Sequence, residues 1–214
     1  VIAQDPTLAE AYYQRGNAFD DLGEQDQALA DYSQAIDANE DYLQAYYNRG
    51  IALARFGRHT EAVTDFDRVI ELGPTVSNAY LNRGASLDEL GEHERAISDY
   101  TAALTCNPEN SDAYFNRART NYYLGRLEET VSDYTRVVEL SPDDAEAFNN
   151  RGLAFDALGE YESAMSDYAT SLELRPEFAE PRSNQGTALE ALGREEEALE
   201  EYLMALEVSP DFAA

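Results

Sequence analysis

The sequence predicts an all-α protein, built as a repeat solenoid of antiparallel helix hairpins. One pattern of residues returns every 34 positions along the 214-residue chain, without an insertion or a deletion. Within each copy, apolar residues follow helical spacing in two separate stretches, and the alternating pattern of a β-strand is missing. A short hairpin of this kind cannot bury its apolar face alone, so we expect neighbouring copies to stack on one another.

Glycine and proline fix the 34-residue period. With the positions of each copy numbered from 1 to 34, glycine occupies position 15 of every copy and position 8 of five, and proline recurs at position 32. Residues 1–8 match the end of a preceding copy. The six full repeats are 9–42, 43–76, 77–110, 111–144, 145–178 and 179–212. We therefore expect a single solenoid domain over residues 1–214, as a fragment of a longer protein.

Each repeat is expected to contain one helix, a tight turn and a second helix. In the second repeat, apolar residues at helical spacing begin at Tyr46 and stop before Gly57. Glycine readily adopts the left-handed conformation that closes a helix, so we expect the first helix to end there. A second helical stretch begins near Ala62 and is expected to stop before Pro74, because proline cannot continue a helix.

The residues that recur most strictly resemble the tetratricopeptide repeat over essentially the whole chain. That pattern has glycine at position 8, alanine at position 20, an aromatic residue at position 24 and proline at position 32. The alanines at position 20 are Ala28, Ala62, Ala96, Ala164 and Ala198. The resemblance implies a right-handed superhelix in which the first helices line a concave groove and the second helices form the convex back. It also implies a protein that binds other proteins.

An unusual feature is arginine at position 7, where the family usually has leucine. The same five repeats carry aspartate at position 23 of the second helix. The resulting pairs are Arg15 with Asp31, Arg49 with Asp65, Arg83 with Asp99, Arg117 with Asp133, and Arg151 with Asp167. We expect bidentate ion pairs that brace the hairpin or its seam with a neighbour. The alternative is a ladder of arginines for an anionic ligand. The sixth repeat departs at both places, with Gln185 and Glu201.

Charge excludes several classes of partner. The net charge is −28, and all fifteen basic residues are arginine. Repulsion from phosphates argues against nucleic acid and against an anionic membrane surface. No apolar run is long enough for membrane insertion. Acids are modestly enriched at positions expected to face the groove, which favours a basic segment of a partner protein.

The sequence offers no constellation for catalysis. The two histidines, His59 and His93, occupy the same position in neighbouring repeats, too far apart to share one metal ion. A single cysteine, Cys106, excludes an internal disulfide. The glycines mark helix ends and do not form a phosphate-binding loop. We therefore expect a protein that is not an enzyme and uses no cofactor or metal.

By the family resemblance, two rows of side chains should line the concave groove. Position 5 supplies an apolar stripe, which consists of Tyr13, Tyr47, Leu81 and Phe115. Asparagines run beside this stripe at positions 6 and 9, namely Asn17, Asn48, Asn82, Asn116 and Asn150. Amides at a regular rise can donate to and accept from the backbone of a bound peptide. Alternatively, these asparagines bond to neighbouring helices, and the two interpretations are compatible.

The fourth repeat departs most from the common pattern. Ala118 replaces the usual glycine, and Asn121 stands where other repeats carry leucine or phenylalanine. Beside them, Arg119, Tyr122 and Tyr123 fall at groove positions. Aromatic residues and arginine dominate binding hot spots, so we expect one here. Sequence drift in an interior repeat is the alternative.

The ends of the array suggest a second possible role. No polar capping helix follows the last repeat, so apolar residues around Leu199 and Leu203 should stay uncovered. The protein could then form homo-oligomers through its uncapped ends and act as a self-assembling scaffold. A peptide-binding module remains our first interpretation.

Overall fold

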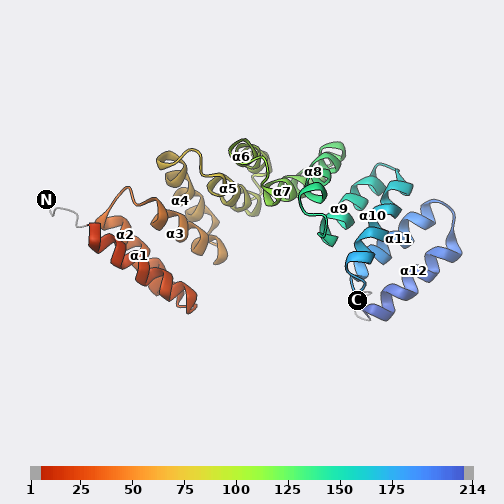
Figure 1. Cartoon of the computed structure of the whole chain (residues 1–214), viewed down its shortest axis with the longest axis horizontal. Coiled ribbons are helices and arrows are strands. Elements are labelled where there is room, and N and C mark those ends of the chain that lie inside the picture. Colours follow the sequence, from red (N-terminus) through yellow and green to blue (C-terminus); the bar gives the residue numbers. More distant parts are fainter. Residues whose placement is uncertain (1–5, 210–214) are drawn as a thin grey trace. The chain divides into compact units, whose positions relative to one another are not determined.

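The computed structural model describes residues 6–209, and every regular element within this range is an α-helix (Figure 1). The twelve helices are α1 (Pro6–Asp21), α2 (Gln25–Ala38), α3 (Leu43–Arg55), α4 (His59–Leu72), α5 (Ser77–Glu89), α6 (His93–Cys106), α7 (Ser111–Tyr123), α8 (Leu127–Leu140), α9 (Ala145–Ala157), α10 (Tyr161–Leu174), α11 (Ala179–Ala191) and α12 (Glu195–Val208). Each predicted repeat therefore contains two helices. The prediction of an all-α solenoid of helix hairpins is confirmed.

The chain divides into two compact units, 1–110 and 111–214. Within each unit, the two helices of a repeat pack against each other, and the second helix also packs against the first helix of the next repeat. The first helices also contact one another, α1 with α3, α3 with α5, and α9 with α11. The division falls between the third and fourth repeats. A single solenoid domain over residues 1–214 stays a prediction.

The turn inside each hairpin depends on glycine, as predicted. In the second repeat, α3 ends at Arg55 and Gly57 has a φ of +73°. The amide of Gly57 donates to the carbonyl of Ala54, and the amide of Arg58 donates to that of Leu53. These bonds satisfy carbonyls that the end of a helix leaves without partners. Position 15 is therefore glycine because the backbone there is left-handed.

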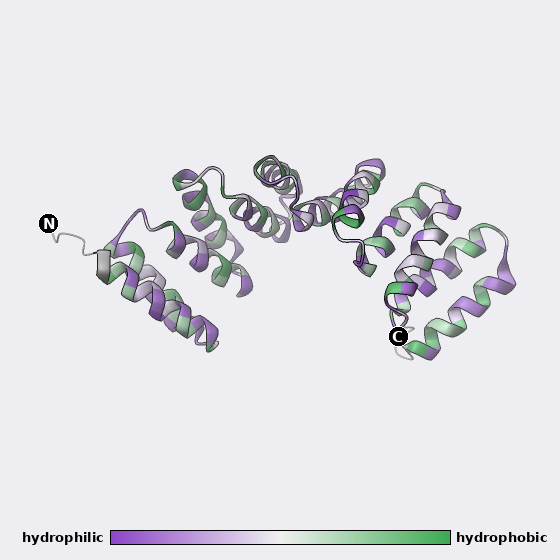
Figure 2. Cartoon of the chain, in the orientation of Figure 1, coloured by the Kyte–Doolittle hydropathy of each residue, from purple (hydrophilic) through white to green (hydrophobic). Residues whose placement is uncertain are grey.

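In the core of each repeat, small residues leave space for one large aromatic ring. In the third repeat, Tyr100 and Ala96 are completely buried, and Leu87 is 1% exposed. A Cβ atom added to Gly84 would lie 2.8 Å from the ring of Tyr100, closer than real Cβ atoms approach. Glycine at position 8 and alanine at position 20 thus make room for the aromatic residue at position 24. Each helix carries both hydrophobic and hydrophilic residues along its length (Figure 2).

Membrane insertion was not expected from the sequence. Within residues 6–209, no helix combines the length and the apolar character that crossing a bilayer requires.

Candidate functional site

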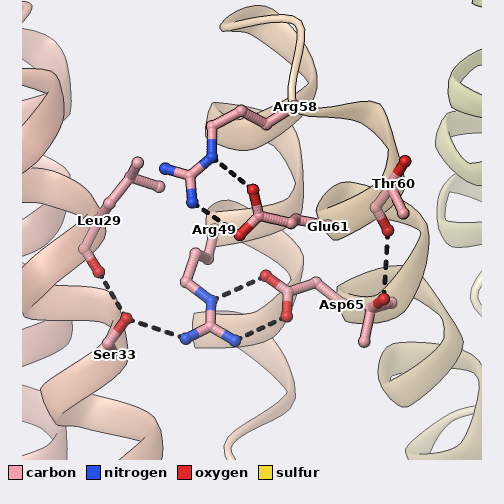
Figure 3. Close-up of polar contacts among 8 residues, drawn as sticks. Leu29, Ser33, Arg49, Arg58, Thr60, Glu61 and Asp65 are labelled. Atoms are coloured by element: carbon pink, nitrogen blue, oxygen red, sulfur yellow. Dashed lines mark hydrogen bonds and ion pairs between the residues drawn. The ribbon is translucent and has the colours of Figure 1, made fainter.

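The arginine at position 7 joins three helices, as the second repeat shows (Figure 3). Nε and Nη2 of Arg49 on α3 donate to the carboxylate of Asp65 on α4, at 2.8 and 2.7 Å. Nη1 donates to the hydroxyl of Ser33 on α2, at 2.9 Å. Ser33 in turn donates to the carbonyl of Leu29. One guanidinium therefore braces its own hairpin and also the seam with the preceding repeat.

The same bidentate pair forms in five repeats. Between Nε or Nη2 and the aspartate oxygens, the distances are 2.6–2.8 Å in every case. The third donor varies in its partner, since Arg83 bonds to Asp67 at 2.6 Å and Arg151 to Thr135 at 3.3 Å. The hydrogen bond to Asp99 raises the pKa of Arg83, so this guanidinium stays charged.

An aromatic ring at position 4 stacks on each of these arginines. The guanidinium carbon lies 5.6 Å from the ring centre of Tyr46 in the second repeat and 5.7 Å from that of Tyr80 in the third. A cavity of about 260 Å³ opens beside Arg49 and is lined also by Glu61 and Asp65. These carboxylates repel anions, and Asp65 holds the donors of Arg49. The geometry therefore does not favour the alternative of an arginine ladder for an anionic ligand.

The predicted groove residues of the first unit lie on α1, α3 and α5 and are partly buried. Nδ2 of Asn48 donates to the hydroxyl of Tyr13 at 3.1 Å and to Oδ1 of Asn17 at 2.8 Å. One repeat later, Nδ2 of Asn82 donates to the hydroxyl of Tyr47 at 3.1 Å. Both asparagines at position 6 of this unit thus bond back to the tyrosine at position 5 of the preceding repeat. This finding favours the interpretation that the asparagines link neighbouring helices.

The apolar stripe of the first unit is packed on its inner side. The ring centre of Tyr13 lies 6.1 Å from that of Tyr32, and the ring centre of Tyr47 lies 6.1 Å from that of Phe66. Leu81 packs against the buried cluster of the third repeat. Burial raises the pKa of Tyr47. The side chains of the stripe therefore expose one edge to solvent and pack against the core of their repeat with the other.

An open cavity of about 370 Å³ lies between the first helices of the first two repeats. Six residues line it, Asn17, Asp20, Asp21, Tyr32, Asn48 and Ile51. The hydroxyl of Tyr32 donates to Oδ1 of Asn17 at 2.9 Å. Burial, together with the charge of Asp20, raises the pKa of Tyr32 to about 12. Asp20 pairs with Arg55 at 2.5 Å. The cavity wall therefore combines amides, one apolar side chain and carboxylates.

In the second unit, three of the predicted residues are exposed and the others are partly buried. Phe115 packs on Tyr134, with ring centres 5.3 Å apart, and Asn116 lies partly buried beside it on α7. Arg119 is exposed, Tyr122 is 39% exposed and Tyr123 is 73% exposed. These three side chains form the exposed surface of α7 that was predicted as a hot spot.

Asn150 belongs to a different network of the second unit. Nδ2 of Asn149 donates to Oδ1 of Asn150 at 3.2 Å, and Nδ2 of Asn184 donates to Oδ1 of Asn149 at 2.9 Å. Burial raises the pKa of Tyr134, and a hydrogen bond with Asn150 offsets only part of this rise. Asparagines at position 6 therefore serve the seams of this unit too.

Sequence reasoning missed two residues of the fifth repeat, Asp156 on α9 and Tyr168 on α10. In the sequence, Asp156 is one of several acids at positions expected to face the groove, and Tyr168 is the aromatic residue at position 24 of its repeat. Within residues 6–209, the buried hydroxyl of Tyr168 has no hydrogen-bond partner. The sequence did contain a signal. In the first repeat Asn17 accepts a hydrogen bond from the aromatic residue at position 24, whereas Leu153, at the same position of the fifth repeat, cannot accept one.

The candidate metal ligands are scattered. His93 bonds through Nδ1 to Asp88 at 3.0 Å, while His59 begins a helix one repeat earlier. Cys106 is exposed. Across residues 6–209, the structure holds no group of three or more His, Cys, Asp or Glu side chains that could bind a metal ion.

Models of one protein family match the sequence along nearly its whole length. Those described as "Tetratricopeptide repeat" or "TPR repeat" match residues 4–77, 77–110, 99–131, 118–159, 145–178 and 179–212. No curated protein matches the sequence.

Several solved structures share the fold. The structure of YrrB, "a TPR protein with an unusual peptide-binding site", is 24% identical with a TM-score of 0.75, over 85% of this chain and 94% of that one. A MamA structure is 22% identical with a TM-score of 0.74, over 80% and 93% of the two chains. MamA of Desulfovibrio magneticus RS-1 is 19% identical with a TM-score of 0.75, over 80% and 97%. At these identities the likeness shows the fold alone.

The repeat pattern, the helix hairpins and the family matches agree. Members of this family are generally non-catalytic modules for protein–protein interaction, and the matches support that class of function for this chain. The chain belongs to the tetratricopeptide repeat family.

Proposed function

We propose that the chain binds a segment of another protein along the first helices of its repeats. The carrying observation is the open cavity of about 370 Å³ between α1 and α3, which has Ile51 and Asn17 in its wall. Amide and carboxylate groups beside an apolar side chain suit a polypeptide, whose backbone needs hydrogen-bond partners and whose side chains need a pocket. The exposed tyrosines of α7 support the same use of the first helices in the second unit.

The acidic background favours a basic segment as the partner. Asp20 and Asp21 both line the cavity, and the net charge of −28 attracts cations over longer distances. Part of the charge of Asp20 is neutralised by Arg55, so Asp21 is the stronger attractor at this place. The preference should weaken at high salt because screening shortens the range of these charges.

A selection of random peptides on the immobilised full chain tests this function. We expect bound peptides whose affinity falls about tenfold or more in Ile51→Glu or Tyr123→Ala, because both substitutions alter exposed parts of the first helices. Gln34→Ala, on the exposed surface of the second helix α2, is the matched control and should leave the affinity unchanged. Binding that neither groove substitution weakens would contradict the proposal.

Self-assembly through α12 is the second candidate function. Leu199, Leu203 and Met204 are 59%, 53% and 43% exposed on this helix. Contiguous apolar surface of this kind marks an interaction site. Light scattering over a concentration series should show a mass that rises with concentration and stays monomeric in Leu203→Glu. A wild-type chain that remains monomeric at high concentration would end this idea.

A further inference from the structure

The cavity of about 370 Å³ between α1 and α3 contains two asparagines whose amide groups are held in one orientation. Nδ2 of Asn48 has two hydrogens, and both are used, one by the hydroxyl of Tyr13 and one by Oδ1 of Asn17. Oδ1 of Asn17 accepts a second bond, from the hydroxyl of Tyr32 at 2.9 Å. Within residues 6–209, this leaves Oδ1 of Asn48 as a free acceptor and Nδ2 of Asn17 as a free donor.

Two carboxylates of α1 add further acceptors to the wall of this cavity. Asp20 also lines a smaller cavity of about 130 Å³ together with Arg55, and its Oδ1 accepts from that arginine at 2.5 Å. Among the residues that the structure describes, Oδ2 of Asp20 forms no hydrogen bond or ion pair, and Asp21 forms none either. Because Arg55 does not line the larger cavity, Asp20 retains one oxygen for a ligand there.

The wall of the larger cavity is therefore rich in acceptors and has one apolar surface. Asp20, Asp21 and Asn48 contribute oxygens from two helices, and Ile51, which is 36% exposed, contributes aliphatic surface. The surrounding repeat, 9–42, contains nine acids and a single arginine, so the electrostatic potential at the cavity is negative. Such a wall repels an anion, whereas it suits a long cationic side chain with an aliphatic stem.

The third repeat shows that a pair of acids does not make this site by itself. It carries acids at the same positions, 12 and 13, namely Asp88 and Glu89. Both oxygens of Asp88 are used there, since one contacts Nδ1 of His93 at 3.0 Å and the other accepts from the hydroxyl of Tyr100 at 2.8 Å. Ala85 stands at position 9 in place of the asparagine. In the first repeat, by contrast, a carboxylate oxygen and two amides stay available together.

We propose that this cavity is a subsite for one arginine side chain of the bound polypeptide. A guanidinium carries five N–H donors in a plane and suits acceptors that are spread over two helices, whereas an ammonium holds its donors at one point. The guanidinium bonds to Asp20, Asp21 and Asn48. Its stem packs on Ile51, and Asn17 donates to a backbone carbonyl beside it. This inference rests on the proposed function and names the side chain that the partner supplies.

The test uses peptides selected on the full chain, labelled and measured by fluorescence anisotropy. Asp21→Asn removes a carboxylate of the subsite, and its control Asp37→Asn removes the same charge from an exposed position of α2 in the same repeat. Arg55→Gln frees the second oxygen of Asp20. Its control is Arg58→Gln, because the side chain of Arg58 is 47% exposed and that of Arg55 is 52% exposed. In the peptides, arginine is replaced by lysine or by citrulline, which keeps the shape without the charge.

We expect the selected peptides to share an arginine at one register. Asp21→Asn should weaken their binding about fivefold, because an acceptor is lost, and Arg55→Gln should strengthen it about threefold, because one is freed. Asp37→Asn and Arg58→Gln should each change the affinity less than about twofold. For the wild type, citrulline should weaken binding about tenfold and lysine about fivefold. Citrulline should cost less in Asp21→Asn, whose melting temperature should equal that of the wild type.

The outcomes that contradict the subsite differ from those that contradict the proposed function. Peptides whose binding Ile51→Glu weakens, but which share no arginine or tolerate citrulline or lysine without loss, would overturn the subsite alone. Equal effects of Asp21→Asn and Asp37→Asn would also overturn it, and so would weaker binding in Arg55→Gln. A second copy of the chain carries arginines too, so a dimer in light scattering that Asp21→Asn dissociates would assign the cavity to self-association and overturn the subsite. A selection that yields no peptide sensitive to Ile51→Glu or Tyr123→Ala would overturn both proposals.

Discussion

The third repeat, 77–110, and the sixth repeat, 179–212, build the same hairpin around different polar groups. In the third, Arg83 donates twice to Asp99 and once to Asp67, and it stacks on Tyr80. In the sixth, Gln185 takes the place of the arginine. Here Arg182 reaches Glu201 through a single contact of 3.4 Å, and its buried Nε has no hydrogen-bond partner among the described residues.

The difference shows that the arginine brace is not required to form the hairpin. Both repeats keep the turn glycine and the glycine that faces the aromatic ring, at positions 15 and 8. The brace instead adds directional bonds between helices that already pack. In an array whose stability is a sum over repeats and their interfaces, the sixth repeat should therefore open before the third.

The largest effect should come from breaking the brace of the third repeat. Asp99 is 5% exposed and accepts two bonds from one guanidinium, so Asp99→Asn leaves that charge poorly paired in a buried setting. Arg83 keeps its bond to Asp67, which limits the loss. We expect the free energy of unfolding to fall by about 2–3 kcal/mol, measured by urea denaturation.

A matched control removes the other carboxylate of the same arginine. Asp67 has a side chain that is 48% exposed, and exposed ion pairs contribute little. Asp67→Asn should therefore cost less than about 1 kcal/mol. Equal losses in the two variants, or unchanged unfolding of Asp99→Asn, would show that the brace does not stabilise the repeat.

A smaller loss of stability should come from replacing the glycine that faces the aromatic ring, and this loss should differ between the same two repeats. Gly84→Ala places a methyl group 2.8 Å from the ring of Tyr100, which is fully buried and held by a hydrogen bond to Asp88. In Gly186→Ala the ring of Tyr202 is even closer, at 2.5 Å, but this tyrosine is partly exposed and can swing outward. We expect a thermal loss equivalent to about 1–2 kcal/mol for Gly84→Ala and nearly none for Gly186→Ala.

The fourth repeat supplies a natural precedent for that comparison. Ala118 occupies the glycine position there, and both it and Tyr134 are buried. The backbone of the fourth repeat therefore accommodates alanine at this position. In Gly84→Ala, the third repeat would have to accommodate it with all of its other residues unchanged. If Gly84→Ala and Gly186→Ala lost equal stability, ring mobility would not be the deciding factor.

The fold could be predicted from the sequence because its signals are local. Gly57 and Pro74 mark helix ends through backbone chemistry that needs no neighbour, and α3 and α4 end where these residues require. The partners of Arg49 within its repeat were also predictable, because one spacing of sixteen residues recurs. Its bond to Ser33 was not, since it crosses a seam whose geometry no spacing reveals.

The candidate site could be predicted only in part for the same reason. The rows of asparagines and aromatic residues were evident, but Asn48 turned out to bond to Tyr13 and Asn17. The free oxygen of Asp20 became visible only when the structure showed that Arg55 of the next repeat bonds to the other one. The polar atoms that remain for a ligand are recognisable in a sequence only once the contact map of the repeat is known.

The smallest effect should come from building the brace into the sixth repeat. Gln185→Arg with Glu201→Asp restores the two residues that pair elsewhere at 2.6–2.8 Å. The gain should be only about 1 kcal/mol, because Arg182 and Ala169 replace the stacking ring and the third acceptor that other repeats provide. Slower amide hydrogen exchange in α12 would measure this gain in stability.

Gln185→Lys with Glu201→Asp is the control, because lysine carries the same charge without the planar guanidinium, and it should gain less stability. Equal protection in both double variants would mean that charge alone, and not bidentate geometry, accounts for the difference between the repeats.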